Sequence, residues 1–166
     1  MKIELKNIKI NQAFSEETTC FKADLYIDGK KVGYASNDGR GGCTDYGVFK
    51  HEDRPLLEKA DEYCKTLPEK DLGSFKLAMN LEHFIDELIY AEDGKKFEKK
   101  LQKDMLKGLC FGTKSSYTLM HWKGRTLAEI LAIPQGRMLV EQEIMKARKN
   151  GKELLNTNIP ELLTAV

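Results

Sequence analysis

The segment 38–51 carries the residue types best suited to binding chemistry. Four of the nine positions 39–47 are glycine, and a glycine backbone lets successive N–H groups converge on one point, which makes a nest for an anion. Arg40 could add a bidentate contact to a phosphate or a carboxylate. The predicted ligand-binding residues are therefore those in and around this loop: Asn37, Asp38, Gly39, Arg40, Gly41, Gly42, Thr44, Asp45 and Tyr46.

The same loop has a structural alternative. It lacks the Walker lysine and the GxGxxG spacing of known phosphate loops. Its glycines would then only satisfy the turn geometry of an Ω-shaped surface connection.

A second candidate surface combines lysines with aromatic residues. Six lysines lie between positions 95 and 107, and Phe111, Tyr117 and Trp122 follow, with Lys123 and Arg125 beyond them. Basic groups beside exposed aromatic rings suit single-stranded nucleic acid. The alternative is a solvated lysine face with the rings in the core. The sequence pI of about 7.6 favours this alternative, so nucleic acid is not an expected partner.

Evidence for catalysis is thin. Cys43, with His51 or His121 as base, could form a thiol nucleophile. We expect nearby N–H groups and Arg40 to lower the pKa of Cys43 and to make it the first cysteine to alkylate.

The helical stretch around position 85 carries a cluster that could bind a metal or transfer protons, although a solvated helix face is the commoner explanation: Glu82, His83, Asp86 and Glu87. We predict no catalytic residue.

The four cysteines and three histidines are scattered along the chain. None of them forms the closely spaced pairs that deliver zinc ligands. We therefore predict no metal site and no cofactor.

The N-terminal third predicts an antiparallel meander. Residues 2–10 alternate as a strand whose phase slips at Lys6-Asn7, which predicts a bulge. A second strand runs from residue 21 to 28, Asp28-Gly29 predicts a hairpin turn, and residues 32–37 return. The glycines of segment 38–51 argue against a regular element there.

The rest of the chain predicts mostly helices. Helices are expected over 53–66 with Asp53 as cap, over 74–92 ending at Asp93-Gly94, and over 95–107. A hairpin over 109–122, a capping box at Thr126 and a helix over 134–150 follow, then a short strand at 154–155 and an irregular tail. Clustered strands and helices of this kind predict an α+β fold, with an antiparallel sheet packed against several α-helices in a single domain over 1–166.

Composition limits the class of protein. The chain has 166 residues, of which 41% are hydrophobic and 32% charged, and no apolar run approaches the ~20 residues of a membrane span. No signal peptide is evident, so we predict a cytoplasmic protein without membrane contact. Segment 52–92 is acidic and segment 93–125 is basic.

Five short segments of the N-terminal 45 residues carry a resemblance: Glu4 to Asn7, Ser15 to Thr18, Phe21 to Ala23, Tyr26 to Lys31 and Ser36 to Gly42. Together they resemble a group of small uncharacterised proteins from bacteria and their phages. It implies a prokaryotic or phage setting, in which small accessory proteins often bind or sequester a host molecule.

These observations together predict a non-enzymatic binding protein. The favoured ligand is a phosphate-bearing small molecule, nucleotide-like, held by the glycine-rich loop at residues 38–47. The alternatives are an inhibitor that binds a host protein through segment 52–92 and a cysteine-dependent enzyme. A homo-oligomer is left open.

Overall fold

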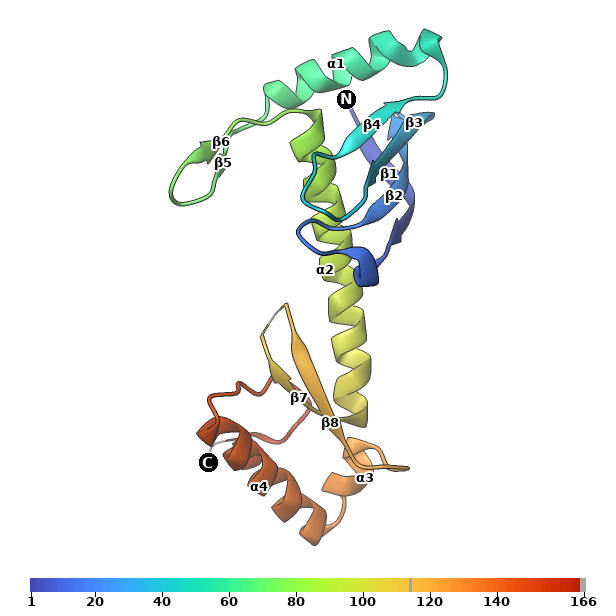
Figure 1. Cartoon of the computed structure of the whole chain (residues 1–166). Helices are drawn as coiled ribbons and strands as arrows, with labels where there is room; N and C mark the ends of the chain where they lie inside the picture. The colour runs from blue at the N-terminus through green and yellow to red at the C-terminus, as the bar shows by residue number, and fades with distance from the viewer. Residues whose placement is uncertain (114, 165–166) are drawn as a thin grey trace. The chain divides into compact units, whose positions relative to one another are not determined.

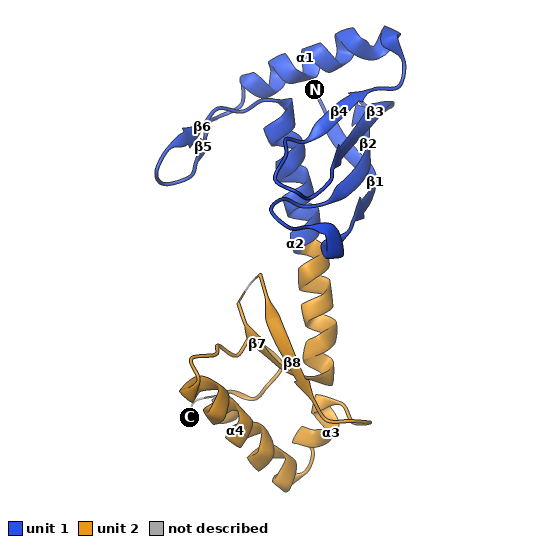
Figure 2. Ribbon diagram, in the orientation of Figure 1, with its two compact units in different colours: residues 1–94 blue, residues 95–166 orange. Residues whose placement is uncertain are grey.

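The computed structural model describes residues 1–113 and 115–164, which form two compact units (Figures 1 and 2). Unit 1 comprises Met1–Gly94 and unit 2 comprises Lys95–Val166. The α+β prediction is confirmed, because an antiparallel sheet and a separate hairpin accompany several helices. That the chain forms a single domain stays a prediction.

Unit 1 contains a four-stranded antiparallel sheet in the order β1-β2-β3-β4. Its strands are β1 (Ile3–Ile10), β2 (Phe21–Ile27), β3 (Lys30–Asn37) and β4 (Asp45–Val48). The predicted bulge is confirmed, since the β1–β2 register shifts between Lys6 and Lys9 and Asn7 has a φ of 54°. The predicted hairpin is confirmed too, with positive φ at Asp28 and Gly29.

Strand β4 corrects the prediction that segment 38–51 holds no regular element. Gly47 pairs with Tyr34, and a Cβ on Gly47 would lie 3.2 Å from the Tyr34 ring. Glycine is therefore compatible with this strand, because the Tyr34 ring fills the space that a side chain would take.

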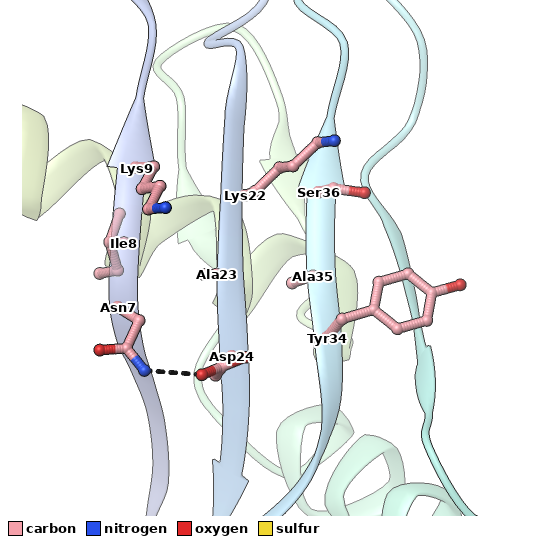
Figure 3. A pocket seen from close by; sticks show the side chains of 9 residues that line it. All are labelled: Asn7, Ile8, Lys9, Lys22, Ala23, Asp24, Tyr34, Ala35 and Ser36. Atoms are coloured by element: carbon pink, nitrogen blue, oxygen red, sulfur yellow. Dashed lines mark hydrogen bonds between the residues drawn. The ribbon is translucent and has the colours of Figure 1, made fainter.

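The core of unit 1 lies on one face of the sheet. Alternate β2 residues from Phe21 to Ile27 pack against α1 (Arg54–Lys65) and the first part of α2 (Leu81–Lys107). The residues between them, such as Lys22 and Asp24, point to the opposite face. Figure 3 looks onto that face, with the helices behind the strands.

Helix α2 replaces two predicted helices. Residues 76–77 form β6 (Lys76–Leu77), which pairs with β5 (Lys70–Asp71), so the helix begins only after Asn80, whose side chain accepts the His83 N–H at 2.8 Å. The predicted stop at Asp93-Gly94 is wrong. An exposed glycine costs a helix only about 1 kcal/mol, which neighbouring turns can offset.

The start of α1 also differs from the prediction. The Asp53 carboxylate makes no capping hydrogen bond and pairs instead with Lys30. One-turn 3-10 helices lie at Gln12–Phe14 and His51–Asp53.

Unit 2 packs a hairpin against helices. Strands β7 (Gly108–Gly112) and β8 (Tyr117–His121) pair as predicted, and α3 (Leu127–Leu131) and α4 (Pro134–Lys149) complete the core. The capping box of Thr126 and Glu129 is confirmed. The predicted strand at 154–155 is only a bridge from Leu154 to Phe111, and the tail holds α5 (Glu161–Thr164) where no element was expected.

The aromatic residues of the basic stretch are engaged in packing. Phe111 is buried, Trp122 packs on the unit 2 core, and the Tyr117 hydroxyl donates to Asp104 at 2.8 Å. These contacts favour the interpretation of the lysines as a solvated face.

Among the described helices, none is long and apolar enough to cross a bilayer.

Candidate functional site

Three consecutive backbone N–H groups of the glycine-rich loop already have acceptors within the protein. The N–H groups of three consecutive residues donate to side-chain oxygens: Gly39 to Asn37 at 2.8 Å, Arg40 to Asp38 at 3.2 Å and Gly41 to Thr18 at 3.2 Å. An anion would have to compete with these oxygens for the same donors. The loop is therefore poorly suited to act as the predicted anion nest.

The contacts and the backbone conformation of Gly39 explain why this position of the loop requires glycine. Its carbonyl accepts the N–H groups of Glu16, Glu17 and Thr18 at 2.9–3.3 Å, which ties the loop to the segment before β2. Its φ is 89°, and an added Cβ would lie 2.0 Å from the Phe14 carbonyl oxygen. At this position the glycine serves turn geometry and close packing.

A cavity of about 400 Å³ lies beside the loop and is acidic. Glu16, Glu17, Glu82 and Asp86 line it, and none of the described lining residues is lysine or arginine. Carboxylates around a phosphate would repel it. The electrostatics of this cavity therefore do not favour an anionic ligand.

The structure separates the predicted site residues. Three of the nine, Asn37, Gly42 and Thr44, line the acidic cavity. The others lie outside its lining: Asp38, Gly39, Arg40, Gly41, Asp45 and Tyr46.

Thr44 fastens the end of the loop to helix α2. It is buried, its N–H donates to Glu82 Oε1 at 3.1 Å, and its hydroxyl donates to Asp86 Oδ1 at 2.5 Å. Partial desolvation and the neighbouring Glu82 raise the pKa of Asp86. Two of the four predicted cluster residues on α2 thus serve this attachment, and no group of three metal-ligating side chains occurs among the residues described.

Cys43 is exposed, but its surroundings oppose the predicted activation. A hydrogen bond to Glu82 raises the pKa of the thiol, and the charges of Glu82 and Asp86 raise it further. The expected lowering of the Cys43 pKa is wrong, because carboxylates from α2, and not cations, surround the thiol.

A cysteine-labelling experiment tests this environment. Replacing Glu82 with glutamine removes an anion, so the Cys43 pKa should fall and its iodoacetamide labelling at pH 7.5 should accelerate several-fold. Glu87→Gln is the control, since Glu87 pairs with Lys70 on the same helix. Equal labelling rates in the two variants would show that Glu82 does not hold the thiol protonated.

A larger depression, of about 810 Å³, lies on the open face of the sheet (Figure 3). Side chains from three adjacent strands line it: Asn7, Ile8, Lys9, Lys22, Ala23, Asp24, Tyr34, Ala35 and Ser36. Sequence reasoning did not identify this site. The strand register could have revealed this site. The bulge in β1 and the Asp28-Gly29 turn together determine which side chains face each other across the strands.

One row of this face combines two lysines and a serine. Lys9 stands directly opposite Lys22, and Lys22 stands directly opposite Ser36. In Figure 3 the Lys9 chain reaches toward β2 and the Lys22 chain toward Ser36. Two ammonium groups and a hydroxyl, all hydrogen-bond donors, thus lie across three strands.

Lys9 and Lys22 form no ion pair with any residue that the structure describes. An acidic residue in the lining of this depression, Asp24, is held by Lys31 at 2.8 Å and by Asn7 at 2.7 Å, and these contacts lower its pKa. The positive charge of this row is therefore left uncompensated.

Comparison of the chain with protein-family models, curated proteins and solved structures finds no match.

Proposed function

We propose that unit 1 is a non-enzymatic binding module that holds a phosphate-bearing small molecule on the open face of its sheet. The phosphate is bound by Lys9, Lys22 and Ser36. This proposal keeps the ligand class predicted from the sequence and moves its site from the glycine-rich loop to the sheet.

The observation that carries the proposal is the cross-strand pair of Lys9 and Lys22. Like charges directly opposite each other destabilise a sheet, so this pair costs the folded state free energy. A bound dianion would compensate both charges, and the Ser36 hydroxyl adds a neutral donor on the next strand. The depression around them gives a ligand of small size room to lie on the sheet.

A cysteine-dependent enzyme is less well supported. An enzyme of that class needs a thiolate, and Glu82 disfavours the thiolate because it raises the pKa of Cys43.

The test is a calorimetric titration of the full chain with pyrophosphate in low salt. We expect saturable binding to one site, weakened as sodium chloride is added, because counterions screen the two lysines. A titration with sodium chloride at the same ionic strength, in place of pyrophosphate, is the control for nonspecific screening. Absence of saturable heat at millimolar pyrophosphate would refute the proposal.

A further inference from the structure

We infer that the ligand is a nucleoside phosphate whose base stacks on Tyr34, an inference that rests on the proposed phosphate site. Tyr34 lies in β3, two residues before Ser36, and both side chains line the same depression (Figure 3). Residues two apart on a strand are separated by about 7 Å along one face. A ribose can span this separation between a phosphate at Ser36 and a base at Tyr34.

The Tyr34 ring is held as a fixed platform. On β4 it packs against Gly47, where a Cβ would approach the ring to 3.2 Å. Interaction with the Asp45 carboxylate on the same neighbouring strand raises the pKa of Tyr34. A ring already packed against Gly47 loses little conformational freedom when a base stacks on it.

A second ring extends the platform. The Phe49 ring centroid lies 6.2 Å from that of Tyr34, the planes are tilted by 38°, and Phe49 is 56% exposed. Because Lys31 lies over the Phe49 ring, Phe49 offers a purine only an apolar edge beside Tyr34 and no second stacking face.

The other aromatic rings of this face favour a single nucleotide, and not a strand of nucleic acid, as the ligand. Lys6 Nζ lies 4.3 Å from the Tyr26 ring centroid, and Lys31 Nζ lies 5.2 Å from that of Phe49. Within the described residues, Tyr34 is the ring of this face with no cation placed over it. One free stacking platform and one uncompensated lysine pair match one base and one phosphate group.

The test compares adenosine diphosphate with pyrophosphate on the full chain by calorimetry. We expect adenosine diphosphate to bind about tenfold more tightly, because base stacking on an aromatic ring contributes an effect of this order. If pyrophosphate binds and adenosine diphosphate binds no better, the base platform is refuted while the phosphate site stands. If neither binds, the phosphate site itself fails.

Variants assign the preference to Tyr34. Tyr34→Leu should abolish the tenfold preference for adenosine diphosphate over pyrophosphate, whereas Tyr34→Phe, which keeps the ring, should retain it. Tyr26→Leu is the control, since Lys6 already covers that ring. Unchanged preference in Tyr34→Leu would overturn the inference. So would a ten-nucleotide single strand that binds more than tenfold better than adenosine diphosphate.

Discussion

Replacing Gly39 with alanine is expected to lower the free energy of unfolding by about 2–5 kcal/mol. A left-handed backbone costs a residue with a side chain roughly 1–2 kcal/mol, and Gly39 has a φ of 89°. The new Cβ would also lie 2.0 Å from the Phe14 carbonyl oxygen, and overpacking of this kind costs roughly 1–3 kcal/mol more. Urea unfolding followed by circular dichroism measures the change.

The matched control for this variant is three residues away. Gly42 has no positive φ, and an added Cβ would meet nothing within 4 Å. Gly42→Ala should therefore change the free energy of unfolding by no more than about 0.5 kcal/mol. Equal losses in the two variants would contradict the conclusion that Gly39 is required for packing.

Replacing both Lys9 and Lys22 with glutamine is expected to weaken pyrophosphate binding by about 100-fold. Each ammonium–phosphate contact contributes on the order of tenfold, which is about 1.4 kcal/mol. The same variant should gain about 0.2–1 kcal/mol in the free energy of unfolding, because the like-charge pair across β1 and β2 is removed. Loss of affinity together with a gain in stability cannot come from misfolding.

The control variant removes the same charge elsewhere. Lys95 and Lys96 are exposed on α2, and within the described part of the chain neither forms an ion pair. Lys95→Gln combined with Lys96→Gln should bind pyrophosphate as the wild type does. An equal loss of affinity in both double variants would mean that net charge, and not the row on the sheet, attracts the ligand.

Local signals were enough to predict most of the fold. The Asp28-Gly29 turn, the phase slip at Lys6-Asn7 and the capping box at Thr126 each depend on residues close in sequence, and each is confirmed. The prediction wrongly divided α2 into two helices, because Gly94 is a local stop signal. The helix continues through Gly94 in spite of its low helix propensity.

The candidate site depended on contacts that no local signal reveals. The oxygen that accepts the Gly41 N–H belongs to Thr18, and the carboxylate beside Cys43 belongs to Glu82, almost forty residues away. The sequence therefore suggested an open loop, although the N–H groups of Gly39, Arg40 and Gly41 already have acceptors. The pair of Lys9 and Lys22 became visible only once the register of β1 and β2 was known.

The most direct measurement is amide chemical-shift mapping of the ¹⁵N-labelled full chain during a pyrophosphate titration. Binding on the sheet predicts that the largest changes in amide chemical shift occur at Lys9, Lys22 and Ser36 and their strand neighbours. The amide chemical shifts of residues 39–43 should not change. Shifts concentrated in residues 39–43, with β1 and β2 unmoved, would show that the glycine-rich loop binds the phosphate and that the sheet does not.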